Sequence, residues 1–280
     1  MSTTTATTTG LAHVRPERAA ALSAFRALLV RDITVLRKSI PFFIVRTIMQ
    51  PLLFVFVFTY VFPKIGQGIG GSQGQGSFSS LLVPGVVAIA CIFQGIQAVA
   101  LPLVQEFSYT REIEDRVMAP LPVWAVAVEK ITSGGLQGML AAIVVFPLAT
   151  FIPATQVSLT VQWPELVTFL PLAALTGSSL GLAIGTRTKP QHVPLIFSVI
   201  VIPITFLGAT YYPWANLDPI AWLKYAVLFN PLVYMGEAFR TALTPQFPHM
   251  ATPLIYLALI GFVAVLSWLG IAGFRKRVLA

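Results

Sequence analysis

Six apolar runs, each about as long as a bilayer-crossing helix, constrain the fold of this chain more than any other feature of its sequence. They cover roughly residues 42–62, 81–104, 131–152, 166–186, 193–212 and 251–274. A helix of about 20 residues crosses the hydrocarbon core of a membrane, and it satisfies its own backbone hydrogen bonds there. The sequence therefore predicts an all-α integral membrane protein with six transmembrane helices.

The composition agrees with a chain that lies mostly in lipid. Of the 280 residues, 56% are hydrophobic and 10% are charged, whereas soluble domains average about 25% charged residues. The net charge of +8 does not indicate nucleic acid binding, because the basic residues cluster beside the apolar runs, where anionic lipid and topology account for them. The single cysteine, Cys91, lies within an apolar run, so no intramolecular disulfide is possible.

The distribution of basic residues predicts the orientation. In a six-span arrangement, 15 of the 18 Lys and Arg residues fall on one side of the membrane, and Lys64, Lys224 and Arg240 fall on the other. Cytoplasmic loops carry an excess of Lys and Arg. Both termini are therefore predicted to be cytoplasmic, in a multi-pass protein of the inner (cytoplasmic) membrane.

The chain before the first apolar run divides into two parts. Residues 1–16 are rich in threonine and are expected to form a disordered cytoplasmic tail. Residues 17–40 place six apolar residues on one narrow helix face: Leu22, Phe25, Leu29, Ile33, Leu36 and Ile40. This spacing of three and four predicts an amphipathic helix that lies in the membrane interface. The alternative is a soluble helix packed on a partner.

Residues 106–122, EFSYTREIEDRVMAPLP, form a charged segment between the second and third runs. Five charges fall between Arg111 and Arg116, and Pro120 and Pro122 follow. An isolated charge is costly in lipid, so this charged segment is expected to project into water on the cytoplasmic side, where a soluble partner can bind it. The alternative is a solvated connector without a partner.

Residues 217–250, before the last run, contain two short semi-apolar helices. Each is expected to begin at a polar capping residue followed by proline, at Asp218-Pro219 and Asn230-Pro231, because proline suits the first turn of a helix. Both helices are too short to span a membrane. They predict an external re-entrant hairpin that dips into the outer leaflet; the alternative is a pair of helices lying flat on the outer surface.

Polar and small residues are rare inside the runs. Arg46 is the one charged residue in them, which disfavours an ion-coupled transporter, because ionisable groups within spans mark such ion pathways. Gln94 and Gln97 share a helix face and are candidates for lining a translocation path; the alternative is hydrogen bonding between helices. The candidate packing glycines repeat every four residues, within one chain or between two copies: Gly177, Gly181 and Gly185.

Several chemical signatures are absent from the sequence. It contains no Gly-x-x-x-x-Gly-Lys-Ser/Thr motif, which binds nucleotide phosphates in P-loop proteins. No group of His, Cys and Glu has the spacing of metal ligands, and no catalytic set is suggested. The chain is therefore expected to bind no cofactor or metal and to carry no catalytic residue, which disfavours a membrane enzyme.

Three stretches resemble a known family when they are taken in order. The first is the charged segment together with the following PVWAVAVEKI, and the second is QPLLFVFVFTYVFP in the first run. The third is YPWANLDPIAWLKYAVLFNPLVYMGEAFR, with its Tyr-Pro, its Asn-Pro and its closing Glu-x-x-Arg. From about Leu28 to the C-terminus, the chain resembles the membrane subunit of ABC-2 type exporters, in particular the daunorubicin-resistance and nodulation lipo-oligosaccharide permeases.

This resemblance implies that residues 41–280 form an ABC-2 transmembrane domain. In this family the fold is six helices with an interfacial helix and external re-entrant helices. Two permease copies pair with two ATPase subunits, and ATP and magnesium bind to the ATPase. The ATPase would contact the charged segment and the interfacial helix around Phe25–Arg37. The residues implied at or beside this coupling contact are Glu106, Arg111, Glu112, Glu114, Asp115, Arg116 and Pro120.

The function that the resemblance implies is ATP-driven export, including multidrug resistance. The substrate would be an amphiphile, such as a drug, a lipid or a glycolipid, that leaves the cytoplasm or the inner leaflet. The motifs do not separate these substrates, and they do not separate a homodimer from a heterodimer or identify the ATPase. The alternative is a secondary transporter or channel that acts without an ATPase.

Overall fold

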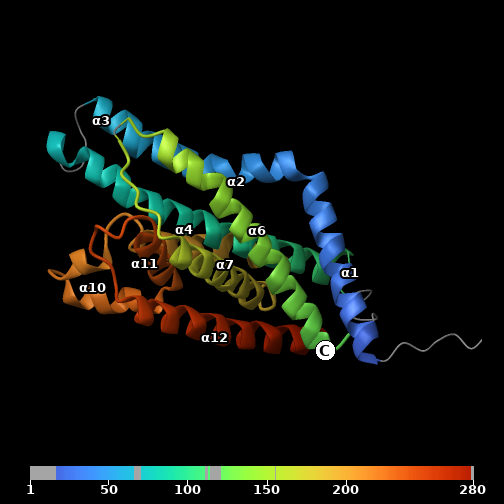
Figure 1. The fold of residues 1–280 in the computed structure, drawn as a ribbon. Helices are drawn as coiled ribbons and strands as arrows, with labels where there is room; N and C mark the ends of the chain where they lie inside the picture. Colours follow the sequence, from blue (N-terminus) through green and yellow to red (C-terminus); the bar gives the residue numbers. More distant parts are fainter. Residues whose placement is uncertain (1–16, 66–70, 111–112, 114–120, 155, 279–280) are drawn as a thin grey trace, which may run out of the picture.

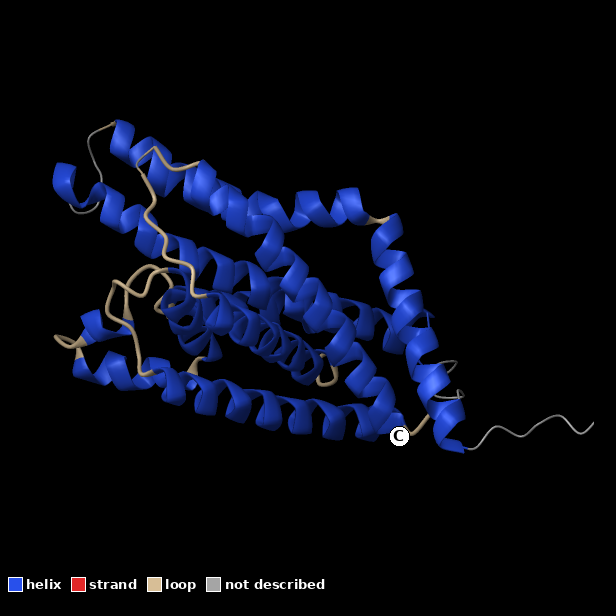
Figure 2. Cartoon of the chain, in the orientation of Figure 1, coloured by secondary structure: helices blue, strands red, loops and turns tan. Residues whose placement is uncertain are grey.

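The computed structural model describes residues 17–65, 71–110, 113, 121–154 and 156–278. These residues form helices and connecting loops without a β-strand (Figures 1 and 2), so the all-α prediction is confirmed. The expected tail, residues 1–16, lies outside the described residues, as do residues 111–112 and 114–120 of the charged segment.

Among the described residues, five helices are long and apolar enough to cross a membrane. The first is α2 (Ile40–Val55), which continues through a π-helical turn, η1 (Phe56–Val61), into α3 (Phe62–Lys64). The other four are α4 (Gly71–Gln105), α6 (Val123–Phe151), α7 (Trp163–Gly185) and α12 (Thr252–Val278). They correspond to the first, second, third, fourth and last of the predicted spans.

The predicted fifth span, residues 193–212, ends earlier than expected. Helical structure runs from Pro190 to Phe206, which makes it shorter than the other five helices. It consists of η3 (Pro190–His192), α8 (Val193–Ile196), η4 (Phe197–Val201) and α9 (Ile202–Phe206). The part of the chain that the structure describes thus contains five helices of spanning length and one shorter apolar helix, where six spans of about 20 residues were predicted.

The short helix ends where the backbone leaves the helical conformation. Ala209 has a φ of 49°, in the left-handed region that L-residues rarely adopt. The carbonyl oxygens of Ala209 and Tyr212 accept hydrogen bonds from Arg240, far along the chain. The apolar character of residues 207–212 predicted a longer helix. Hydrophobicity alone does not show that a distant arginine binds these carbonyl oxygens.

Helix α1 (Glu17–Lys38) meets α2 at a corner at Ser39 (Figure 1). The helix predicted over residues 17–40 therefore ends at Lys38. It lies across the end of the bundle at which α6 begins and α12 ends, and it contacts α6 and α2 (Figure 1). Its apolar face is only partly covered by protein, because Leu22 is 62% exposed and Ile33 is 44% exposed.

Helix α4 is the centre of the bundle, where it packs against α6, α7 and α11 (Pro231–Leu243). The face of α7 that meets α4 carries the candidate packing glycines, Gly177, Gly181 and Gly185. A Cβ atom added at Gly181 would lie 2.9 Å from the Cα of Ile96. Cβ atoms added at Gly177 and Gly185 would lie 3.0 Å from the Cα atoms of Ile92 and Ala100, respectively. Small residues let helix backbones approach closely, so the three glycines set the α4–α7 distance within one chain.

The segment over residues 217–250, named the outer segment after its predicted side of the membrane, differs in part from its prediction. Asn230 caps α11, because its side chain accepts a hydrogen bond from the backbone N–H of Leu232 at 3.0 Å. Asp218 does not begin a helix as expected: it pairs with Lys224, and α10 (Ala221–Ala226) begins three residues later. The short 3₁₀ helices η5 (Trp214–Leu217) and η6 (Val227–Phe229) lie on either side of α10.

Helix α11 is buried over its whole length. It packs on α4, α7 and α12 inside the end of the bundle that is far from α1 (Figure 1). The alternative of two helices lying flat on a surface is wrong for α11, because such a helix would expose one face. In α10, by contrast, the side chains of Trp222 and Tyr225 are 73% and 66% exposed.

Candidate functional site

A polar cavity of about 470 Å³ opens between α1, α2, α4 and α6. This volume falls within the range of small-molecule sites, roughly 300–1,000 Å³. Its polar lining includes three basic and two acidic side chains, Arg31, Arg46, Lys130, Asp32 and Glu106, and the amides of Gln97, Gln105 and Gln137. Val35, Leu36 and Leu101 are among the apolar residues of its wall. The cavity therefore offers charged, amide and apolar surfaces together.

Lys130 lines this cavity and contacts residues of two other elements. Its Nζ lies 2.6 Å from Oε1 of Glu106, in the π-helical turn η2 (Glu106–Thr110), and 3.9 Å from Oδ2 of Asp32 in α1. The side chains of Lys130 and Glu106 are buried. A buried ion pair must have good geometry to offset its desolvation. The contact links α1 and the charged segment to α6.

Sequence reasoning missed this ion cluster. Lys130 was assigned to the cytoplasmic connection, because the third span was predicted to begin at residue 131. The helix begins instead at Val123, directly after Pro122, whose backbone is extended. Pro120 and Pro122 were a usable signal, since proline favours the first turn of a helix; that rule would have placed Lys130 two turns inside α6.

The effects of replacing Lys130 by Met and Glu106 by Gln are expected to be non-additive. Their charged atoms are 2.6 Å apart and both side chains are buried, so we expect a coupling energy of about 0.5–3 kcal/mol. Unfolding of the two single variants and the double variant in SDS-containing mixed micelles would measure it. The same cycle on the more exposed pair Lys224→Met and Asp218→Asn is expected to give about 1 kcal/mol or less. Additive effects at Lys130 and Glu106 would show that the contact contributes nothing.

The two candidate path residues take different positions. Gln94 is buried between helices: its Oε1 accepts from Thr47 Oγ1 at 3.2 Å, and its Nε2 donates to Gln137 Oε1 at 3.4 Å. This geometry is the interhelical hydrogen bonding that was the alternative interpretation. Gln97 lies one turn along α4 and lines the cavity. A translocation path through either residue stays a prediction.

The charged segment continues directly from α4 and leads directly into α6. Glu106 and the following residues to Thr110 extend α4 as η2, and α6 begins at Val123. Six of the candidate coupling residues lie outside the described residues: Arg111, Glu112, Glu114, Asp115, Arg116 and Pro120. Glu106 is the member of the set that the structure places, and it faces Lys130 rather than solvent.

Arg277, near the C-terminal end of α12, contacts both the end of α7 and the charged segment. Its Nη1 donates to the carbonyl oxygens of Gly185 and Thr188 at 3.2 and 2.9 Å, where a cation complements the C-terminal end of α7. Its guanidinium lies 4.5 Å from the ring centroid of Phe107, within the charged segment. Sequence reasoning used Arg277 only as a topology signal.

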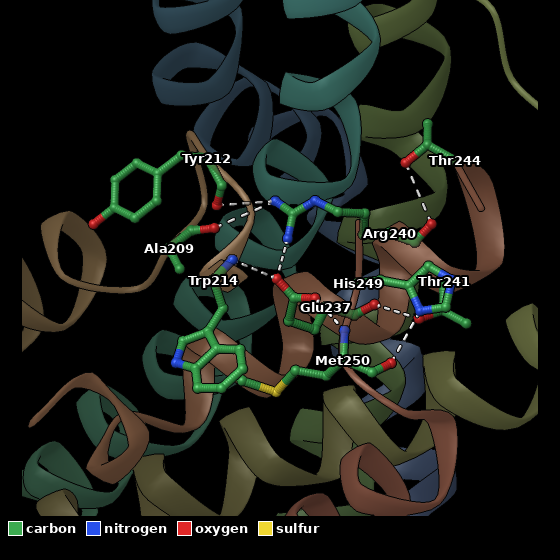
Figure 3. A network of polar contacts seen from close by, with 9 residues as sticks. All are labelled: Ala209, Tyr212, Trp214, Glu237, Arg240, Thr241, Thr244, His249 and Met250. Atoms are coloured by element: carbon green, nitrogen blue, oxygen red, sulfur yellow. Dashed lines mark hydrogen bonds and ion pairs between the residues drawn. The ribbon is translucent and has the colours of Figure 1, made fainter. Parts of the chain in front are cut away.

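A second polar centre lies around α11, at the end of the bundle that is far from α1 (Figure 1), and Figure 3 shows its contacts. Glu237 and Arg240 of α11 form an ion pair, and both side chains are almost fully buried. Glu237 also accepts hydrogen bonds from the backbone N–H groups of Trp214 at 2.9 Å and Met250 at 2.8 Å. The carboxylate therefore holds the chain on both sides of the outer segment.

Arg240 completes this second polar centre, which we call the outer centre because it holds the predicted outer segment. Its Nη2 donates to the carbonyl oxygens of Ala209 and Tyr212, each at 3.3 Å (Figure 3). The Glu-x-x-Arg spacing of the sequence puts the two charged side chains on one helix face. No signal in the sequence identified the four backbone groups that they bind.

The long apolar helices and the polar cavity between them are features of a multi-pass α-helical membrane protein. The chain belongs to the ABC-2 type transporter family, whose sequence profile matches residues 23–244. It is 28% identical over 198 residues to the "Inner membrane transport permease YadH" of Escherichia coli strain K12, which covers 70% of this chain and 75% of that protein. The proteins of the same name from Escherichia coli O157:H7 and Shigella flexneri match equally well.

The protein is thus a membrane permease of the ABC-2 transporter family, and the family resemblance seen in the sequence is confirmed. The narrower resemblance to daunorubicin-resistance and nodulation permeases stays a prediction.

Proposed function

We propose that this chain is the non-catalytic membrane subunit of an ATP-driven exporter that moves an amphiphilic substrate out of the cytoplasm or the inner leaflet. The observation that carries the proposal is the contact of Lys130 with Glu106 and Asp32. Through it, a force on the charged segment reaches α1, α4 and α6, which are three of the four helices that line the polar cavity. In this proposal, a partner that binds the charged segment changes the shape of the substrate cavity.

The energy source is a separate ATPase subunit. The sequence lacks a P-loop, and the family is the ABC-2 transporter family, so ATP and magnesium are assigned to the partner and no cofactor to this chain. The proposed contact consists of the charged segment, residues 106–122, and α1 around Phe25–Arg37. Complementary charges fix the orientation of two proteins more than their affinity, which suits the mixed signs of this segment.

The proposed membrane arrangement has six crossings, of which Pro190–Phe206 is the short one. Helix α1 lies in the cytoplasmic interface, where lipid would cover its exposed residues Leu22 and Ile33. The start of α1 and the end of α12 lie at the same end of the bundle (Figure 1), which supports two cytoplasmic termini. At the other end, α10 and α11 form the re-entrant segment, in which α11 is shielded by protein and α10 faces outward.

The assembly is proposed to contain two permease copies and two ATPase subunits, as a homodimer or a heterodimer. The α7 glycine face is occupied by α4 of the same chain. A second copy therefore packs on another surface in this proposal. Multidrug resistance is one of the cellular roles that fit an exporter of amphiphiles.

Reversing two charges of the charged segment tests the proposal. The double variant Glu114→Lys with Arg116→Glu is expected to insert and fold, because substitutions of water-facing side chains seldom cost more than about 0.5 kcal/mol. It is expected to lose co-purified ATPase by about tenfold or more, which corresponds to 1.4 kcal/mol of binding free energy, and to lose export. The measurements are pull-down from membranes and efflux from inverted vesicles.

The matched control is the reversed pair Asp218→Lys with Lys224→Glu, at the opposite end of the molecule, which is expected to keep ATPase and export. Normal export by the Glu114/Arg116 variant with its ATPase bound would mean that the charged segment is a solvated connector. Transport that follows an ion gradient without any ATPase would instead favour a secondary transporter or channel.

A further inference from the structure

Arg46 is the one charged residue in the first predicted span, and its side chain is exposed. It lies in α2, six residues after the first residue of that helix, and it lines both the large polar cavity and a small pocket deeper in the bundle. Within the part of the chain that the structure describes, Arg46 makes no hydrogen bond or ion pair. An ionisable residue within a span normally pairs with a neighbour or marks a substrate pathway.

The other charges of the cavity do not supply a partner for Arg46. The acids among the lining residues are Asp32 and Glu106, and Lys130 contacts both of them. Among the described residues of the lining, three side chains are basic (Arg31, Arg46 and Lys130) and two are acidic. The cavity is therefore suited to an anion and unsuited to a cation.

The cavity that Arg46 lines also contains amide and apolar side chains. Gln97 lines the cavity and the deeper pocket together with Arg46. The deeper pocket is small, about 20 Å³, and the hydrogen bonds of Gln94 to Thr47 and Gln137 join α2, α4 and α6 at this level. Val35, Leu36 and Leu101 provide an apolar wall elsewhere in the cavity.

We infer that this cavity binds the anionic head group of an amphiphile, with Arg46 as the residue that recognises it. A guanidinium presents two parallel N–H groups that match a phosphate or a carboxylate. The amide of Gln97 donates to the same head group, and the apolar wall holds the first methylenes of the tail. The inference rests on the proposed function in taking the substrate to be an amphiphile, and it narrows that substrate to the anionic class.

The test measures binding to the purified permease alone, in uncharged maltoside micelles without ATPase. The probes are lysophosphatidylglycerol, which is anionic, and lysophosphatidylcholine, which is zwitterionic; bound fractions are read from native mass spectra. The wild-type chain is expected to bind the anionic probe about tenfold more tightly. Equal affinity for the two probes would overturn the inference.

Two variants assign the preference to the cavity. Arg46→Gln removes the charge and is expected to abolish the preference; it should still insert, because a charge in a span disfavours insertion. Gln97→Glu keeps the side chain size, places a carboxylate in the two pockets that Arg46 lines, and is expected to abolish the preference as well. The control Arg275→Gln removes an exposed charge at the end of α12 and is expected to behave as wild type. A preference that survives in Arg46→Gln and in Gln97→Glu would contradict the assignment.

A competition arm separates a lipid head group from a free anion. Inorganic phosphate at millimolar concentration is expected to leave the bound lysolipid in place, because it lacks the tail that contacts the apolar wall. Displacement by phosphate would identify a free-anion site and overturn the amphiphile assignment. Because no arm uses ATP, a failure of ATPase coupling would leave these binding results standing, and a failure of binding would leave the coupling proposal standing.

Discussion

Gly181→Leu is expected to lower the yield and the stability of the folded protein sharply. A Cβ atom at this position would lie 2.9 Å from the Cα of Ile96 and 3.0 Å from the carbonyl oxygens of Gly95 and Ile96. These neighbours are backbone atoms of α4, so they cannot rotate away, and the whole helix must shift. Overpacking a well-packed site typically costs about 1–3 kcal/mol, and a leucine against a helix backbone is expected to reach the upper end of that range or exceed it.

The measurement is the yield of monodisperse protein after extraction, together with unfolding in SDS-containing mixed micelles. Gly261→Leu is the matched control, because no heavy atom lies within 4 Å of a Cβ added at Gly261 in α12. That variant is expected to retain wild-type yield. If Gly181→Leu and Gly261→Leu gave the same yield, the close α4–α7 contact would be refuted.

Arg240→Met is expected to destabilise the protein by about 3–5 kcal/mol, the usual result of leaving one member of a buried ion pair behind. Glu237 would keep its two backbone donors, Trp214 and Met250, but it would lose the cation that compensates its charge. The carbonyl oxygens of Ala209 and Tyr212 would lose the donor they share. The loops on both sides of the outer segment should therefore loosen together.

Lys224→Met provides the comparison, because Lys224 pairs with Asp218, which is 70% exposed. An exposed ion pair contributes about 1 kcal/mol or less. Lys224 also lies 4.2 Å from the ring centroid of Trp214, a contact of about 0.5–2 kcal/mol, so this variant is expected to be destabilised clearly less than Arg240→Met. Unfolding of both variants, with limited proteolysis between residues 207 and 250 as a local readout, would check the prediction. Equal stability of Arg240→Met and Lys224→Met would mean that the outer centre does not hold the fold.

Residue patterns predicted the long helices well, because their apolar runs match the thickness of a bilayer. The helix boundaries were less accurate at Lys130, which the prediction placed before the third span and the structure places inside α6. The error came from reading a charge as the end of a helix. Charge is a poor boundary signal where a second charged side chain, here Glu106, is available to pair with it.

The outer segment shows a second limit of prediction from sequence patterns. The cap at Asn230 was predicted from a local pattern and is confirmed, because a capping side chain acts within two residues of itself. Asp218 offered the same local pattern, but it pairs with Lys224 instead. The complete burial of α11 had no signal in the sequence, since a semi-apolar helix of that length also suits a surface.

The sequence by itself determined that the chain is a helical membrane protein, where its long helices lie, and which family it resembles. These properties depend on the apolar character of each run and on short motifs, which are local in the chain. Only the tertiary structure decided that Lys130 joins α1, the charged segment and α6. It also decided that Arg240 binds the carbonyl oxygens of Ala209 and Tyr212 and that Arg46 lines a polar cavity. Each of these depends on residues brought together from distant parts of the chain, and the closeness of such groups is set by helix packing rather than by spacing along the sequence.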